Sequence, residues 1–216
     1  IQGEFDDALR AFAQETTVRG RGFWVRTLHE FNGDWYPWGI LYEYQGDRGN
    51  SRSQLRDAFA HVITLFREEG SPVKFQLDIN ANNGKADKRP FSAFWPGTDG
   101  LDAVSITSYN RAYSTPDHQY SESFAAGFAD AYQQVSELTD LPIWVAETAT
   151  SSSHTDKPAW ILDAWESIAL DFPRVVQVTW FLSNKVNEGY LTDWDLNTEA
   201  DVRAFVDGFL LMRQLT

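Results

Sequence analysis

Two glutamates stand directly after short apolar runs of the sequence, where a strand is expected to give way to a loop. Glu30 follows residues 23–28, and Glu147 follows the run Ile143-Trp144-Val145-Ala146. The carboxyl ends of parallel strands share one edge of a barrel, and that edge carries the catalytic groups. Two carboxylates that are distant in sequence are what a retaining glycosidase needs, one as general acid/base and one as nucleophile. The pair therefore favours carbohydrate hydrolysis.

Aromatic side chains and a histidine surround Glu30. His29 precedes it, and Trp35, Tyr36 and Trp38 follow within eight residues. Aromatic rings present flat apolar faces on which sugar rings can stack. A glutamate near a turn is usually a solvated surface charge, so the argument for Glu30 depends on these neighbours. His29 could bind a sugar hydroxyl or orient the acid, and it could equally be an ordinary core or surface histidine.

Two further aromatic residues end other predicted strands. Tyr109 closes the strand before that of Glu147, so its hydroxyl could donate a hydrogen bond to this carboxylate and keep it ionised and aimed. Trp180 lies near the end of the last strand and could form the floor under the reacting sugar, although a core position is nearly as well supported. The alternative for Glu147 is a capping or salt-bridging loop residue.

Other polar residues near the strand ends rank below the two glutamates. Asp34 sits within the turn itself, and Asp78 comes two residues before its strand ends. Several more polar or aromatic side chains lie on the predicted loops, and each is expected to be an ordinary loop residue. They are Asn80, Asn110, Arg111, Asn184, Asp193 and Trp194.

Composition limits the classes of partner. The 216 residues carry a net charge of −13, which argues against nucleic acid and anionic membrane surfaces because both require basic patches. The chain has nine tryptophans, 15% aromatic residues and no cysteine. Most of the aromatics are expected in the core, but a polysaccharide cleft also uses them. The four histidines show no metal-ligand spacing, so no metal is expected.

The apolar periodicity predicts alternating strands and helices, which is typical of a parallel sheet. We count five strand-then-helix units, whereas a closed barrel has eight. The predicted strands are residues 23–28, 73–79, 101–108, 141–146 and 175–181. The predicted helices are residues 3–15, 51–70, 121–138, 157–170 and 198–213.

The segment of residues 26–39 resembles the acid/base segment of the family 26 glycoside hydrolases, which include β-mannanases and mixed-linkage β-glucanases. The shared pattern is His-Glu, a hydrophobic residue, Asn-Gly, and a tryptophan five positions after the glutamate. Relatives in the wider barrel clan usually have asparagine before the acid/base, so His29 makes the resemblance specific.

The resemblance implies roles for individual residues. Glu30 would be the acid/base on the fourth barrel strand and Glu147 the nucleophile on the seventh. Tyr109 would be the sixth-strand tyrosine that contacts the nucleophile. Trp35 and Trp180 would contact the sugar at the cleavage point.

The resemblance covers nearly the whole chain, beginning with residues 1–6, which resemble the link between the third strand and its helix. Strands one to three have no counterpart among the 216 residues. The expected fold class is therefore α/β, a (β/α)8 TIM barrel that is N-terminally incomplete, with strands four to eight present. Residues 1–216 are expected to form one catalytic domain that needs the missing strands for closure. Without them, the open strand edges predict a chain that is poorly soluble, that dimerises through those edges, or that is stable only with the missing three strands.

The resulting prediction is a retaining endo-β-glycosidase that hydrolyses a β-linked plant or microbial polysaccharide, with β-1,4-mannan as the first candidate. No cofactor, metal, nucleic acid or membrane partner is expected, and the protein is expected to be secreted or at the cell surface. The alternatives are a mixed-linkage β-glucanase or β-xylanase of the same family, a non-catalytic carbohydrate-binding barrel, or a portion of a longer enzyme. The residues predicted to bind substrate are His29, Trp35, Trp38, Tyr109 and Trp180.

Overall fold

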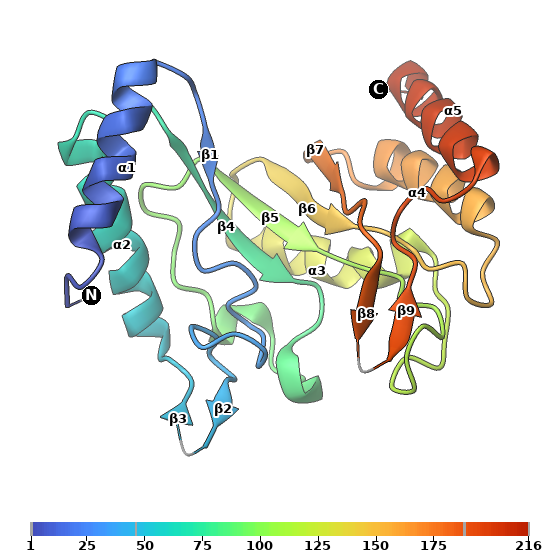
Figure 1. Cartoon of the computed structure of the whole chain (residues 1–216), viewed down its shortest axis with the longest axis horizontal. Coiled ribbons are helices and arrows are strands. Elements are labelled where there is room, and N and C mark those ends of the chain that lie inside the picture. Colours follow the sequence, from blue (N-terminus) through green and yellow to red (C-terminus); the bar gives the residue numbers. More distant parts are fainter. Residues whose placement is uncertain (1, 46, 188, 216) are drawn as a thin grey trace. The chain divides into compact units, whose positions relative to one another are not determined.

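The computed structural model describes residues 2–45, 47–187 and 189–215 (Figure 1). Helices alternate with parallel strands along most of the chain. The chain divides into two compact units. The first unit consists of Ile1–Ser105 and Gln134–Leu141, and the second of Ile106–Gln133 and Pro142–Thr216. The prediction of a single catalytic domain stays a prediction.

The first unit contains strands in the order β1-β4-β5, of which β5 straddles the boundary between the units. β1 pairs with β4 in parallel, with Trp24 opposite Lys74 and Val25 opposite Phe75. Figure 1 shows the two helices of this unit, α1 and α2, side by side. The elements are α1 (Asp6–Arg19), β1 (Trp24–Val25), β2 (Glu43–Tyr44), β3 (Asp47–Arg48), α2 (Arg52–Glu68), β4 (Lys74–Asn80), the 3-10 turns Gly84–Ala86 and Phe91–Ala93, and β5 (Ala103–Thr107).

Helix α2 shows how the sequence fixes an element of this unit. Ser51 caps its N-terminus by accepting a hydrogen bond from the Gln54 backbone N–H, while the Gln54 side chain accepts one from the Ser51 backbone N–H. This capping box satisfies donors that no helical carbonyl reaches. Leu55, Phe59 and Ile63, which recur at helical spacing, are buried. Burial of this apolar face packs α2 against the rest of the first unit.

The second unit contains strands in the order β5-β6-β7. β6 pairs with β7 in parallel, from Ile143 opposite Val175 to Thr148 opposite Trp180. Its two C-terminal helices, α4 and α5, lie against each other, as Figure 1 shows. The elements are α3 (Phe124–Leu138, which also enters the first unit), β6 (Ile143–Thr148), α4 (Lys157–Asp171), β7 (Val175–Trp180), β8 (Lys185–Asn187), β9 (Tyr190–Thr192) and α5 (Glu199–Leu215).

The structure confirms the predicted α/β class. The five strands predicted for the parallel sheet correspond to β1, β4, β5, β6 and β7, and the five predicted helices correspond to α1 to α5. Three details differ. β1 is only two residues long, and the positive φ angles of Leu28 and Glu30, 50° and 52°, show that the backbone after it is not extended. Glu147 lies inside β6 rather than after it. The sequence reading also missed two antiparallel hairpins, β2–β3 and β8–β9. The assignment of the strands as four to eight of a barrel stays a prediction.

Candidate active site

The backbone of Glu30 is held beside β4 in the first unit. Its N–H donates to Asp78 Oδ2 at 3.2 Å, and Asp78 is fully buried. Asp78 Oδ1 also accepts from Ser105 Oγ at 2.9 Å, and Arg26 Nη1 lies 3.8 Å from Asp78 Oδ2. Asp78, considered above as a rival carboxylate, is thus a buried brace. Together these contacts offset the cost of the left-handed conformation at Glu30.

Both carboxylate oxygens of Glu30 accept a hydrogen bond from a neutral donor. Asn80 Nδ2 donates to Oε1 and Trp35 Nε1 donates to Oε2, each at 2.7 Å. Trp35 can fold back over the turn because residue 33 is glycine, where an added Cβ would lie 2.5 Å from the Trp35 ring. The Trp35 side chain is still 43% exposed. Glu30 is therefore oriented, and its tryptophan partner presents a ring to solvent.

Asn32 connects the Glu30 loop to the end of β4. Its fully buried side chain donates to Asn80 O at 2.8 Å and accepts from Asn80 N at 2.9 Å. It also donates to Asn83 Oδ1 at 2.9 Å. Sequence reasoning missed the roles of Asn32 and Asn80, since it treated the first as a turn residue and the second as a loop residue. One signal in the sequence could have indicated these roles. Asn32 and Asn80 each follow a predicted strand, and the ends of adjacent parallel strands lie close together.

His29 and Trp38 belong to an aromatic group beside Glu30. The His29 ring meets Tyr36 edge-on, with centroids 4.5 Å apart, and Tyr36 stacks on Trp38 at 4.5 Å and 12°. Trp38 Nε1 donates to the His29 carbonyl at 2.8 Å. Trp38 therefore fixes the backbone that precedes Glu30. Asp34, the other rival carboxylate, stays half-buried in the turn.

Glu147 is held in the second unit by strand pairing. Its carbonyl accepts from the Ser108 N–H at 3.0 Å, and the next carbonyl, that of Thr148, accepts from Phe181 N at 2.9 Å. The Tyr109 hydroxyl donates to Glu147 Oε2 at 2.5 Å, which confirms the predicted hydrogen bond. Both side chains are half-buried. A phenol bonded to a carboxylate favours the ionised form of the carboxylate and fixes its direction.

Trp180 packs against the two C-terminal helices of the second unit. Its ring packs against Trp160 and Trp165 of α4 and Phe205 of α5, with centroids 6.0, 5.5 and 5.2 Å away. Its Nε1 is buried and has no hydrogen-bond partner among the described residues. This packing agrees with the core position that the sequence analysis gave as the alternative for Trp180. The aromatic neighbours of Tyr109 are instead Phe181 at 6.0 Å and Trp194 at 4.9 Å, neither of which was predicted to be there.

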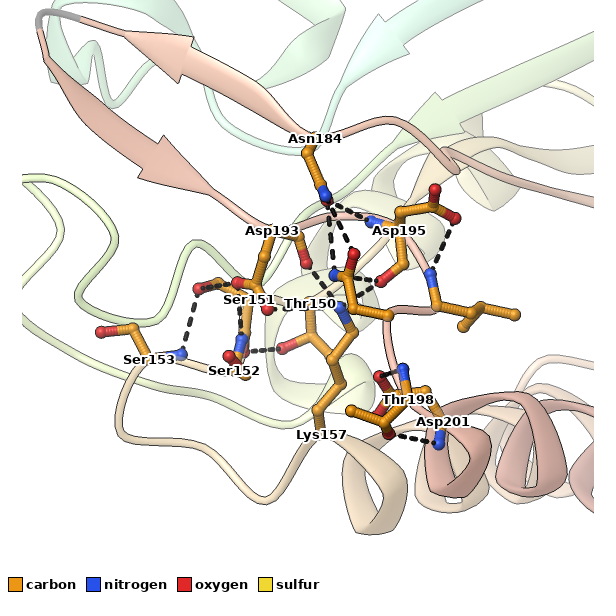
Figure 2. A network of polar contacts seen from close by, with 12 residues as sticks. Thr150, Ser151, Ser152, Ser153, Lys157, Asn184, Asp193, Asp195, Thr198 and Asp201 are labelled. Carbon is orange, nitrogen blue, oxygen red and sulfur yellow. Dashed lines mark hydrogen bonds and ion pairs between the residues drawn. The ribbon is translucent and has the colours of Figure 1, made fainter.

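Other predicted loop residues of the second unit brace the segments that follow the strands (Figure 2). Asp193 Oδ1 accepts from Ser151 Oγ at 2.9 Å and from Ser152 N at 3.0 Å. Asn184 Oδ1 accepts from Asp195 N at 2.9 Å, and buried Asn110 donates to Thr150 Oγ1 at 2.9 Å. These side chains order loops, which is what the sequence predicted for them.

The charge of Asp193 is stabilised by its surroundings. Burial alone would raise the pKa of this carboxyl, but the Ser152 and Ser151 hydrogen bonds and the nearby Lys157 outweigh burial and lower the pKa below its usual value. Lys157 is almost fully buried, and its Nζ donates to the carbonyls of Asp193 and Asp195, each at 2.5 Å. In contrast, burial raises the pKa of Glu122.

Across residues 2–45, 47–187 and 189–215, no group of three or more histidine, aspartate or glutamate side chains is arranged to hold a metal ion. Within the same part of the chain, no helix is long and apolar enough to cross a membrane.

Comparison with known proteins shows which folds the chain resembles. No protein-family model matches the chain. The chain superposes on the catalytic domain of a Bacillus sp. JAMB-750 GH26 endo-β-1,4-mannanase with a TM-score of 0.65 at 16% identity, covering 95% of this chain and 56% of that one. A modular endo-β-1,4-mannanase from Cellulomonas fimi gives a TM-score of 0.65 at 16% identity, covering 98% and 46% of the two chains.

A curated relative adds a match in sequence. Endoglucanase H of Acetivibrio thermocellus is 32% identical over 203 residues, which make up 94% of this chain and 21% of that protein. The chain is thus similar in sequence to part of a curated endoglucanase and similar in fold to the catalytic domains of family 26 glycoside hydrolases. It spans about a fifth of the length of this curated relative and about half of the solved family 26 chains.

Proposed function

We propose that the protein is a retaining endo-β-glycosidase, with Glu147 as nucleophile and Glu30 as general acid/base. The observation that carries this proposal is the hydrogen bond from Tyr109 to Glu147, because it aims and stabilises an ionised carboxylate at the end of a parallel strand. The two oriented oxygens of Glu30 support the second role. The family 26 relatives named as mannanases and an endoglucanase support glycoside hydrolysis.

The mechanism has two displacements. Glu147 attacks the anomeric carbon and forms a glycosyl ester, while the glycosidic C–O bond breaks and Glu30 gives its proton to the leaving oxygen. Glu30 then takes a proton from water as the water oxygen attacks the same carbon, and the ester bond to Glu147 breaks. Each carboxyl group returns to its starting state, and the product keeps the configuration of the substrate.

This mechanism sets a distance that the assembled site must meet. In retaining enzymes the two carboxyl groups stand about 5–5.5 Å apart, whereas inverting enzymes require roughly 6.5–9.5 Å to admit a water molecule. We therefore expect the shorter separation between Glu30 and Glu147 when the protein binds an oligosaccharide. A crystal structure of such a complex checks this expectation directly, and a separation beyond about 9 Å would contradict a retaining mechanism.

Sugar contacts in this proposal come from residues on both glutamate-bearing segments. Trp35, which is exposed and bonded to Glu30, is the candidate for stacking at the cleavage point, with His29 and Trp38 completing that side. Tyr109 serves as the positioning residue of Glu147. Phe181 and Trp194, whose rings lie beside Tyr109, are further candidates for sugar contacts on that side.

We place β-1,4-mannan first among the substrates, because the solved relatives are named mannanases. A β-glucan is the second candidate, favoured by the relative named an endoglucanase. The match covers only 21% of that relative. The name endoglucanase therefore describes a protein of which most lies outside the matched region. A polymeric substrate also favours a protein that is secreted or held at the cell surface.

The test is hydrolysis of mannan, mixed-linkage β-glucan and xylan by the purified protein, with Glu30→Gln as the matched control. We expect new reducing ends from mannan, produced in the middle of the polymer, and at least a hundredfold less from the control. The anomer first formed, followed by proton NMR, should match the β-configuration of the substrate. Turnover by Glu30→Gln at the parent rate, or release of the α-anomer, would contradict the proposal. Oligosaccharide binding without turnover would favour the non-catalytic alternative.

A further inference from the structure

The second unit contains a cavity of about 450 Å³ between the loops that follow β5 and β6 and the hairpin strand β9. These loops leave the carboxyl ends of their strands, which is also where Tyr109 and Glu147 lie. The residues that line the cavity and carry the argument are Tyr113, Ser114, Ser151, Ser152, Tyr190 and Asp193. We propose that this cavity binds one neutral pyranose unit of the substrate chain, at a distance from the bond that is cleaved.

Two tyrosines give the cavity aromatic walls. Tyr113 is 38% exposed and Tyr190 is 47% exposed, so both rings are available to a ligand. The Tyr113 ring is supported from behind by His154, with centroids 5.0 Å apart and nearly edge-on. Aromatic rings of this kind stack on the C–H faces of sugars as they do on other apolar groups.

The backbone around Tyr113 is held in an uncommon conformation. Ala112, Tyr113 and His154 have positive φ angles of 38°, 57° and 52°. Such residues cost free energy, persist only where their surroundings hold them, and cluster at ligand sites. The Tyr113 N–H donates to the His118 carbonyl at 2.8 Å, which fixes this turn. The aromatic wall is therefore placed before a ligand arrives.

The polar wall is built on Asp193 (Figure 2). Ser151 Oγ and Ser152 N both donate to Oδ1, while Oδ2 lies 3.6 Å from Lys157 Nζ. A carboxylate can accept about four hydrogen bonds, so Asp193 has capacity for sugar hydroxyls, and its side chain is 22% exposed. Ser114 Oγ is buried at the same cavity and has no partner among the described residues.

These features define the chemical class of the ligand. Aromatic faces with serine hydroxyls and one carboxylate suit a ligand that has C–H faces and many hydroxyl groups. The ionised Asp193 and the net charge of −13 disfavour acidic sugars. A neutral hexopyranose meets all of these conditions.

The cavity is connected to the nucleophile by short stretches of chain. Ser151 follows Glu147 by four residues, which is at most about 14 Å of extended backbone. On the other side, Trp194 follows Asp193 directly, and its ring contacts Tyr109, the partner of Glu147. A sugar held in the cavity therefore lies within reach of a chain bound at Glu147. This inference rests on the proposed function for the identity of the polymer.

The test is a calorimetric titration of the whole chain carrying Glu147→Gln, which blocks turnover, with β-1,4-mannohexaose and with cellohexaose. Tyr113→Ala and Tyr190→Ala are the cavity variants. Tyr120→Ala is the matched control, because Tyr120 is 51% exposed on the same loop as Tyr113 and does not line the cavity. Thermal unfolding of each variant verifies that it is folded, and Tyr113→Phe keeps the ring if the alanine variant unfolds.

We expect each cavity variant to weaken hexasaccharide binding roughly threefold to tenfold, with Tyr113→Phe and Tyr120→Ala close to the parent. Unchanged affinity in folded Tyr113→Ala and Tyr190→Ala would overturn the inference, as would a parent that binds neither hexasaccharide. Binding is measured apart from hydrolysis. Hydrolysis of polysaccharide by the unsubstituted protein, without a cavity effect in the Glu147→Gln background, therefore contradicts this inference alone. A cavity effect without hydrolysis by the unsubstituted protein contradicts the enzyme proposal alone.

Discussion

The surroundings of the two glutamates differ in how rigidly the backbone is fixed. Glu147 lies within the six-residue strand β6, where pairing to both neighbouring segments determines its position, and one phenol orients its carboxylate. Glu30 lies on a loop after the two-residue strand β1, in a left-handed conformation, and side chains do the fixing. A nucleophile must approach one carbon atom along one line, and a strand provides that precision. An acid/base serves first the leaving oxygen and then water, which a braced loop permits.

The bracing also differs in charge. Around Glu30 it comes mainly from the amide side chains of Asn32, Asn80 and Asn83, with Asp78 buried beneath. In the unit that holds Glu147, the loops after the strands depend on the charged pair Asp193 and Lys157. Neutral amides do not titrate, whereas a carboxylate does. The two regions should therefore respond differently to substitution and to acid.

The largest effect is expected for Glu147→Ala. Loss of the nucleophile should reduce kcat at least a thousandfold, since no bond to the enzyme can form. The unfolding temperature should change little, because strand pairing rather than the side chain holds this position. Initial rates on polysaccharide and a thermal unfolding curve check both parts. Parent-like turnover would mean that Glu147 is structural.

Asn32→Ala should destabilise the region of Glu30. The substitution leaves the backbone N–H and carbonyl of Asn80 without the partners that they have now, and we expect the free energy of unfolding to fall by about 2–4 kcal/mol. Urea denaturation measures this loss. Asn82→Ala is the control, because that side chain is exposed two residues from Asn80. Equal stability of the two variants would show that the amide bracing is not needed.

Tyr109→Phe should slow turnover less than removal of the nucleophile. The ring can keep its contacts with Phe181 and Trp194, so only the hydrogen bond to Glu147 is lost. A hydrogen bond to a charged group of this strength corresponds to roughly a tenfold fall in kcat, or about 1.4 kcal/mol. Steady-state kinetics with KM unchanged would fit a positioning role. An effect as large as that of Glu147→Ala would instead give Tyr109 a direct part in the chemistry.

The smallest effect is expected for acidification of the loops near Asp193. Because the folded-state pKa of Asp193 is lowered, its ionised form stabilises the fold above the ordinary aspartate pKa of about 3.9, and this contribution is lost as the pH falls through the folded-state value. Asp193→Asn should therefore be less stable than the parent at pH 7, by under about 1 kcal/mol since solvent screens a partly exposed group.

The difference between Asp193→Asn and the parent should shrink below about pH 4. Unfolding free energies measured from pH 7 downwards check this trend. A gap that widens in acid would contradict the assigned role of Asp193.

The sequence predicted the five helices and the five strands of the parallel sheet among the described residues. Each has an apolar face or run, which repeats every 3.6 residues in a helix and every two residues in a strand. It also predicted the Tyr109 contact with Glu147, since adjacent strand ends must meet. It did not predict how short β1 is, and it did not predict the two hairpins, because the strand pairings of the hairpins leave no apolar pattern. Phe181 and Trp194 were missed because strand alternation and loop closure decide which of several neighbouring aromatics faces Tyr109.

Covalent trapping of the nucleophile tests the central claim most directly. A 2-deoxy-2-fluoro β-mannosyl or β-glucosyl oligosaccharide with an activated leaving group slows hydrolysis of the glycosyl ester more than its formation, so the intermediate accumulates. Mass spectrometry of the digested protein should show the added sugar on the peptide that contains Glu147 and none on Glu147→Gln. A sugar attached to the peptide that contains Glu30, or turnover of the reagent with no adduct, would contradict the assignment.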